Sequence, residues 1–180
     1  MPWESGYHLA LTSGSQTDLW AVWLDAAGRP TVADALGRLF ADLGADIAAR
    51  KPTCWLSGRC CKFDSFGHKL YVTGLEIAWM VVRLDSVGRA RLANAELADF
   101  DGCPFQIDKL CSVHALRPLG CRVYFCDANA QQWQNAVYES FLDRLRALHE
   151  QFGLEYRYIE WRAGLAECRD CMAGPAAAAR

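Results

Sequence analysis

The segment at residues 103–126 constrains the fold more than any other part of the sequence, because it concentrates cysteine in a stretch that cannot fold by itself. Pro104, Pro118 and Gly120 prevent a long helix or a central strand here. A segment this short cannot build its own apolar core, so we expect bound metal to hold it together. The candidate ligands in it are four cysteines: Cys103, Cys111, Cys121 and Cys126.

The remaining cysteines form an upstream cluster and a pair near the end of the sequence. Residues 1–10 lack the basic and apolar regions of a secretory signal, so the sequence predicts a cytoplasmic protein. Thiols stay reduced there, which favours metal ligands or redox groups over a disulfide framework. We predict all nine cysteines as metal ligands, enough for at most two four-cysteine sites with one left over. The five outside the first segment are Cys54, Cys60, Cys61, Cys168 and Cys171.

Thiolates are soft ligands that suit zinc and iron–sulfur clusters. The spacing Cys168-x2-Cys171 is short enough for both thiols to chelate one ion. The adjacent Cys60 and Cys61 are expected to point in different directions, so they would serve two sites or include a spare thiol.

Two arginines flank one of the predicted ligands. Arg117 and Arg122 lie on either side of Cys121. We predict that they bind the cofactor, by offsetting the negative charge of the thiolates or by donating hydrogen bonds to sulfur. The alternative is that both are solvated surface side chains.

Composition excludes some classes of protein. The net charge of −2 and the pI of about 6.1 give no basic footprint for nucleic acid. The longest apolar run, residues 77–82, is far too short to span a membrane. The chain has 180 residues, 52% of them hydrophobic, which suffices for a real core. Seven Trp residues indicate large core side chains or a docking face for a protein partner.

Hydrophobic periodicity predicts two long amphipathic helices, at residues 31–50 and 128–152. Thr31 would cap the first of them, with Asp34 three residues later. Residues 7–24 fit either a hairpin or a short helix, since their periodicity does not decide. Residues 25–30 read as a turn.

Shorter elements lie around and after the cysteine clusters. A strand is predicted at residues 70–73, and a helix is predicted to follow it to about Leu84. Thr73 and Glu76 have the spacing of a capping box, in which each side chain caps the backbone of the other at the start of this helix. Further short helices are expected at residues 93–98 and 156–165, and nothing in residues 175–180 can be buried.

The sequence thus predicts a mainly helical α+β fold. Its centre would be a small, metal-stapled, cysteine-rich core with short strands, flanked by amphipathic helices. The predicted divisions are an N-terminal extension at residues 1–50, a cysteine-cluster domain at 51–127, C-terminal helices at 128–172 and a tail at 173–180.

The order of these motifs resembles a known family. Cys-x5-Cys-Cys, Cys-Pro-Phe, a cysteine seven residues on, Arg-Pro and Cys-Arg-x-Tyr-x-Cys are similar to the YkgJ-type cysteine-cluster proteins, also called the CxxCxxCC family. The resemblance covers residues 54–126 and implies zinc, iron or iron–sulfur binding. Ser57 stands where the family has a cysteine, and His114 where it usually has tyrosine. His114 or the C-terminal cysteine pair would replace the lost thiol.

These observations leave three functions open. The first is an iron–sulfur protein, with a 4Fe–4S cluster favoured, that transfers electrons or supports an enzyme. The second is a zinc-stapled adaptor that binds a protein partner through an aromatic or helical surface. The third is a metal carrier or thiol-redox protein. Catalysis by the loop carboxylates Asp99, Asp101 or Asp108 is not favoured, because loop aspartates are usually solvated.

Overall fold

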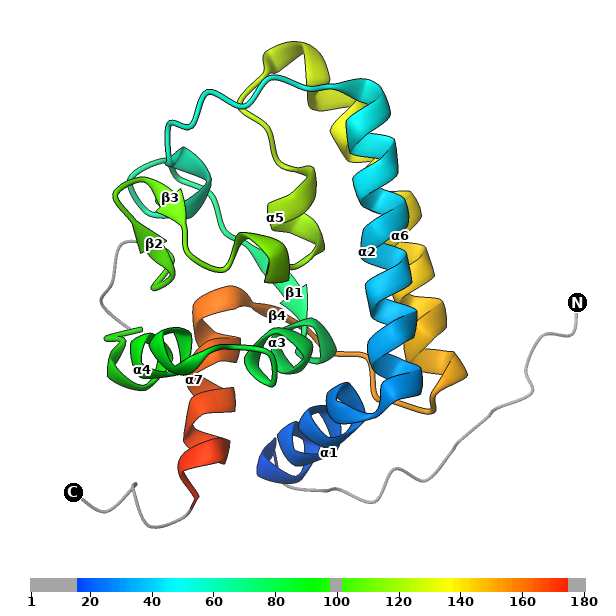
Figure 1. Ribbon diagram of the computed structural model, residues 1–180, viewed down its shortest axis with the longest axis vertical. Helices are drawn as coiled ribbons and strands as arrows, with labels where there is room; N and C mark the ends of the chain where they lie inside the picture. The colour runs from blue at the N-terminus through cyan, green and yellow to red at the C-terminus, as the bar shows by residue number, and fades with distance from the viewer. Residues whose placement is uncertain (1–15, 98–101, 175–180) are drawn as a thin grey trace, which may run out of the picture.

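The computed structural model describes residues 16–97 and 102–174 of the chain. It has a mainly helical α+β fold, so the predicted class is confirmed (Figure 1). Three short 3₁₀ helices, η1 (Arg59–Cys61), η2 (His114–Leu116) and η3 (Ala128–Ala130), accompany the main elements. The main elements in order are α1 (Gln16–Gly28), α2 (Pro30–Arg50), β1 (Tyr71–Thr73), α3 (Gly74–Val81), α4 (Ser86–Asn94), β2 (Gln106–Ile107), β3 (Leu110–Cys111), α5 (Leu119–Val123), α6 (Gln131–Gln151), β4 (Tyr158–Glu160) and α7 (Trp161–Ala173).

The two long helices predicted from periodicity are confirmed and lie side by side, as α2 and α6 (Figure 1). The apolar face of α2 is buried, as is the centre of α6 at Phe141 and Leu145. Gly153, at φ 62°, follows the end of α6 as expected. One hydrophobic core joins these helices to the rest of the described chain, and its largest fully buried side chains include Trp20, Trp23, Trp161, Phe63 and Phe105.

The N-terminal part of the described chain is more helical than the sequence predicted. Residues 16–28 form α1, whereas residues 7–15 lie outside the described residues. The turn predicted at residues 25–30 is wrong, because α1 continues to Gly28 and Pro30 already begins α2. The cap predicted at Thr31 is also wrong: Arg29 occupies the cap position without a side-chain bond. Proline at the first helical position needs no hydrogen bond there and has a suitable φ, so no capping side chain is required.

The predicted strand at residues 70–73 is confirmed as β1, which pairs antiparallel with β4. The helix predicted at residues 156–165 is therefore wrong in its first part. Its true start is Trp161, where Glu160 caps α7 by accepting a hydrogen bond from Ala163 N. Pairing between segments about 90 residues apart decided this, and local periodicity cannot reveal such a partner.

The region after α3 also differs from the prediction. The helix expected to reach Leu84 ends at Val81, and Asp85 caps a new helix, α4, by accepting from Gly88 N at 2.7 Å. The short helix expected at residues 93–98 is thus only the end of α4, and residue 98 lies outside the described range. None of the described helices is both long and apolar enough to cross a bilayer.

A buried carboxylate, Glu76, connects the start of α3 to the start of α5. The predicted reciprocal cap is present: Thr73 Oγ1 accepts from Glu76 N, and Glu76 Oε2 accepts from Thr73 N at 2.8 Å. The other oxygen, Oε1, accepts from Leu119 N at 2.7 Å. Glu76 is only 3% exposed, and burial raises its pKa. Its hydrogen-bond donors offset the cost of burying it.

We predict that Glu76→Gln destabilises the protein by about 1–3 kcal/mol, because one carboxylate oxygen becomes an amide nitrogen facing a buried donor. Urea unfolding would measure the loss. The matched control is Glu139→Gln on the exposed face of α6, which should stay within about 0.5 kcal/mol of the parent protein. Equal stability of both variants would contradict this role of Glu76.

A buried histidine, His149, joins α6 to the loop before β4. Its Nδ1 lies 2.9 Å from Glu155 O, which also accepts from Trp23 Nε1. Nδ1 must carry the proton in this contact, so Nε2 is the unprotonated nitrogen. Nε2 is buried without a partner among the described residues. Burial lowers the pKa of His149, since the charged ring would place a second N–H where nothing accepts it.

The stability of the protein should therefore decrease as the pH falls below about 6.5, the pKa of an unfolded-state histidine. The sign follows because the unfolded chain binds a proton in this range more readily than the folded one. His149→Gln keeps a side-chain donor but cannot titrate, so its free energy of unfolding should depend less on pH between about 6.5 and 5. An unchanged pH dependence in urea titrations of this variant would show that His149 is not the cause.

Candidate metal centre

Five thiols from four separate segments line one small, enclosed cavity of about 30 Å³. The other lining residues are Phe63, Val113, Arg117, Pro118 and Trp161. None of the nine cysteines is in a disulfide bond. The five at the cavity are Cys60 and Cys61 of η1, Cys103 before β2, Cys111 of β3 and Cys121 of α5.

Backbone contacts bring the upstream cysteines to Cys103. Cys103 N donates to Cys61 O at 2.8 Å. This close approach requires glycine before Cys103: Gly102 has φ 124°, and a Cβ there would lie 2.1 Å from Cys61 O. The side chain of Gln106 adds a second link by donating to Gly58 O at 2.8 Å.

The other two cysteines are positioned by a hairpin and by a helix start. Cys111 lies on β3 opposite Gln106 in the β2–β3 hairpin. Cys121 lies in the short helix α5, whose first residue donates its N–H to Glu76. The guanidinium of Arg117 also donates to Cys121 O at 3.1 Å. Each thiol is thus fixed through the backbone of its own segment.

Two of the sulfurs at the cavity lie at a distance that suits shared metal ligation, but the described side chains do not form a coordination sphere. The Sγ atoms of Cys60 and Cys61 are 4.0 Å apart. In a tetrahedral zinc site with Zn–S bonds of about 2.3 Å, neighbouring sulfurs lie about 3.8 Å apart. The two thiols also line the same cavity, whereas the sequence suggested that they diverge. Within the described ranges, however, no three His, Cys, Asp or Glu side chains are arranged to hold a metal ion as they stand.

The arrangement raises the pKa values of the thiols, so that loss of their protons is unfavourable. The pKa of Cys61 is raised to about 12, chiefly by a hydrogen bond with Cys103. A hydrogen bond with Cys61, followed by burial, raises the pKa of Cys60. Burial and the neighbouring Cys61 and Cys111 raise the pKa of Cys121 well above its usual value. Crowded thiolates in a low-dielectric site repel one another, and a bound cation would remove that repulsion.

The two predicted cofactor-binding arginines have different positions. Arg117 lines the cavity, and its positive charge lowers the pKa of Cys60, Cys111 and Cys121 against the larger opposing effects. Arg122 does not line the cavity. It donates to Arg117 O and Ala115 O and lies over the Phe40 ring at 4.3 Å. Burial and Arg117 lower its pKa to about 10. Arg122 therefore fastens the segment that carries Arg117.

The remaining predicted ligands lie elsewhere. Cys54 is exposed, and Cys126 Sγ lies 3.5 Å from the hydroxyl of Ser57, the residue at the family's missing cysteine position. His114 is exposed and does not line the cavity.

The C-terminal cysteine pair is also outside the cavity. Cys168 and Cys171 lie one turn apart on α7, inside a helix rather than after one. Cys168 is fully buried, and burial raises its pKa to about 12.

Trp161 is a site residue that the sequence did not indicate. Its ring lines the cysteine cavity and is 1% exposed. Its Nε1–H is buried without an acceptor among the described residues. A buried donor that lacks a partner costs free energy, so this N–H fits a bound group whose sulfur can accept a hydrogen bond. The sequence carried no signal for it, because Trp161 is 40 residues beyond Cys121 and reaches the cavity through the β1–β4 pairing.

Comparisons of the chain with protein-family models, with curated proteins and with solved structures find no match. The resemblance to the YkgJ-type family therefore remains a prediction from the spacing of the motifs.

We predict that Gly102→Ala displaces the two segments that meet at Cys61 and Cys103. The expected loss exceeds about 2 kcal/mol, since it combines backbone strain with a contact against Cys61 O. Gly67→Ala is the matched control, because Gly67 also has positive φ (64°) but has open space around its Cβ position. Urea unfolding of both variants separates the backbone strain, which both share, from the steric contact with Cys61 O, which only Gly102→Ala has. Equal losses of unfolding free energy would show that the close approach is unimportant.

Proposed function

We propose that the chain is a metal-binding protein whose centre is the cavity lined by Cys60, Cys61, Cys103, Cys111 and Cys121. The observation that carries the proposal is the convergence of these thiols, from four segments, on one enclosed space. Hydrophobic packing alone would not collect five thiols in one place, whereas thiolate ligation requires it. Four of them complete a closed site, and the fifth remains as a neighbour.

The size of the cavity favours a single ion. About 30 Å³ accommodates at most two or three water-sized groups, since each needs about 10–15 Å³. A zinc or iron ion fits this space once the side chains rotate toward it. The ion would hold the cysteine segments together. Its apparent binding free energy, about 10–16 kcal/mol for structural zinc, is comparable to the stability of a whole domain, about 5–15 kcal/mol.

An iron–sulfur cluster is the second candidate. It is favoured by the surplus thiol and by the unpartnered Nε1–H of Trp161, which suits inorganic sulfide as an acceptor. A 4Fe–4S cluster is larger than the cavity, so the thiols would have to move outward to hold it. Electron transfer is then the expected role, whereas a single zinc ion indicates a structural centre in an adaptor.

The aromatic docking surface stays a prediction and has a narrower basis than the sequence suggested. Trp20, Trp23, Trp79 and Trp161 are buried in the core. Trp55 is 59% exposed, and it lies in the same loop as the exposed Cys54. A protein partner would therefore meet the loop before η1 rather than a broad tryptophan face.

The metal site is tested by elemental analysis of protein purified without oxygen. We expect about one zinc or iron per chain, with acid-labile sulfide and visible absorption only if a cluster is present. The double variant Cys61→Ser, Cys103→Ser leaves only three of the five thiols at the cavity, too few for a closed four-cysteine site, so it should lose the metal. The matched control is the double variant Cys168→Ser, Cys171→Ser, which removes thiols outside the cavity and should retain the full metal content.

Circular dichroism on each variant shows whether it has folded, and anaerobic titration with Zn²⁺ tests each folded variant directly. Full metal content in the folded double variant Cys61→Ser, Cys103→Ser would overturn the proposal. So would a parent protein that takes up neither zinc nor iron in such a titration.

A further inference from the structure

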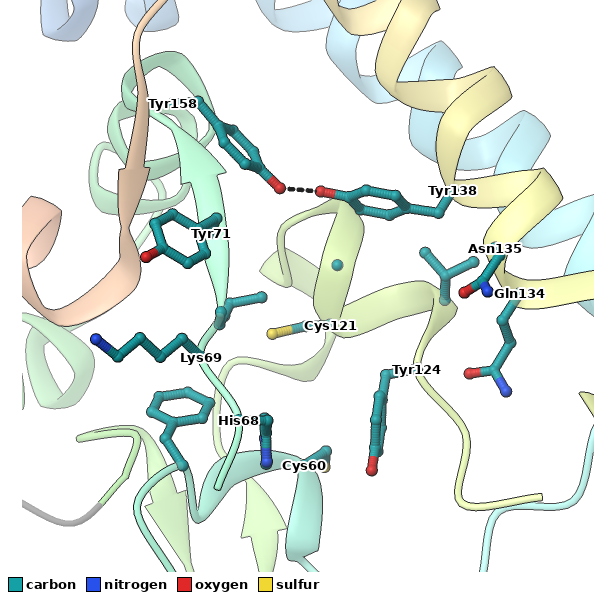
Figure 2. A pocket seen from close by; sticks show the side chains of 14 residues that line it. Cys60, His68, Lys69, Tyr71, Cys121, Tyr124, Gln134, Asn135, Tyr138 and Tyr158 are labelled. Atoms are coloured by element: carbon teal, nitrogen blue, oxygen red, sulfur yellow. Dashed lines mark hydrogen bonds between the residues drawn. The ribbon is translucent and has the colours of Figure 1, made fainter. Parts of the chain in front are cut away.

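A second, larger pocket lies beside the cysteine cavity (Figure 2). Its volume is about 360 Å³, within the range of pockets that bind small molecules. Cys60, Phe63 and Cys121 line both spaces and form the wall between them. A molecule in this pocket would therefore lie next to the thiols of the proposed metal centre.

Two pairs of flat rings contribute to the walls of the pocket. Tyr71 of β1 and Tyr158 of β4 stack with their ring centroids 5.6 Å apart. His68 and Tyr124 are nearly parallel, at an interplanar angle of 10° and a centroid distance of 5.8 Å. Figure 2 shows the side chains of both pairs around Cys121. Walls of this kind favour a planar, aromatic occupant, which can stack on them or meet them edge to face.

Phenol hydroxyls supply donors at the end of the pocket next to α6. The hydroxyls of Tyr138 and Tyr158 are hydrogen-bonded to each other (Figure 2). Burial raises the pKa of both, so both keep their protons at neutral pH. Two O–H groups bring two protons, and their mutual bond uses one of them. The second proton can be donated to an acceptor on a ligand.

The charged side chain among the lining residues of the pocket is positive. Lys69 lines it, and no aspartate or glutamate is among its lining residues. The ammonium lies on a long, exposed side chain that can turn toward a bound group. The carboxylates of Glu76 and Glu139 are near enough to help raise the pKa of Tyr158, but neither lines the pocket. Lys69 is therefore the charged side chain that an occupant would meet, and it complements one negative charge.

We propose that this pocket binds a small, planar aromatic monocarboxylate. Its ring system would lie among the tyrosines and His68, and its carboxylate would accept from Lys69 and from a tyrosine hydroxyl. Binding does not require a metal, although Cys60 and Cys121 place the occupant against the proposed centre.

The proposal is tested by isothermal titration calorimetry of the full chain with 2-naphthoate, and with 2-naphthalenemethanol as the neutral probe of similar shape. We expect 2-naphthoate to bind once per chain with a Kd of about 1 mM or tighter, and more tightly than the alcohol. Lys69→Gln should weaken only 2-naphthoate, by about two- to fivefold, as for loss of an exposed ion pair. Lys62→Gln, an exposed lysine outside the pocket, should change neither.

A second variant tests the location without touching the core. Asn135 is exposed on α6 and lines the pocket, so Asn135→Trp should fill the space and abolish binding of both probes. Circular dichroism and thermal unfolding identify any variant that fails to fold. Binding of 2-naphthoate to folded Asn135→Trp at parent affinity would overturn the proposal. Equal effects of Lys69→Gln on both probes, or absence of 2-naphthoate binding to the parent, would also overturn it.

Metal content measured on the same samples separates this proposal from the proposed function. Both pocket variants should retain the metal of the parent. Probe binding by a protein that takes up no metal would refute the metal centre and leave the pocket proposal intact. Metal uptake by a protein that binds no probe would refute the pocket proposal and leave the metal centre intact.

Discussion

The hydrogen bonds of Glu76 are the interaction on which the rest of the structure depends. One oxygen caps α3 through Thr73, and the other accepts from Leu119 at the start of α5. Because α5 carries Cys121, a carboxylate buried in the helical core sets the position of a thiol at the cavity. An apolar residue of similar size at position 76 could pack, but it could not accept a hydrogen bond from Leu119 N. The core and the cysteine segments are therefore joined by specific polar contacts as well as by hydrophobic burial.

The cavity is assembled by the backbone rather than by the thiols themselves. Cys103 N donates to Cys61 O, and the side chain of Gln106 donates to Gly58 O, so contacts within the protein hold the two loops against each other. Such preorganisation lowers the entropy that metal binding has to offset, because protein contacts already bring the segments together. The cost of this arrangement is the crowding of the thiols, which raises their pKa values. Arg117 offsets part of that cost from one side.

Local patterns predicted the local structure well. The periodicity of α2 and α6 and the spacing of Thr73 and Glu76 were sufficient, since each lies within one element. The wrong turn at residues 25–30 and the wrong cap at Thr31 were local errors, because Pro30 begins α2 without a capping side chain. The wrong helix at residues 156–160 depended on a distant partner, since β4 is a strand only because β1 is beside it. The same limit applied to the site. Spacing could not separate Cys121, which lines the cavity, from Cys126, which does not, and no sequence rule connects Trp161 to either.

The shared wall of Cys60, Phe63 and Cys121 couples the two cavities physically. If a cation binds in the cysteine cavity, the thiols of Cys60 and Cys121 become thiolates and move toward it. The shared wall of the larger pocket then changes in both shape and charge. An aromatic carboxylate would then bind best with its ring against the shared wall and its carboxylate group away from the sulfurs, toward Lys69. Thermodynamic linkage is reciprocal: if a bound cation changes the affinity of the pocket for its occupant by some factor, the occupant changes the affinity for the cation by the same factor.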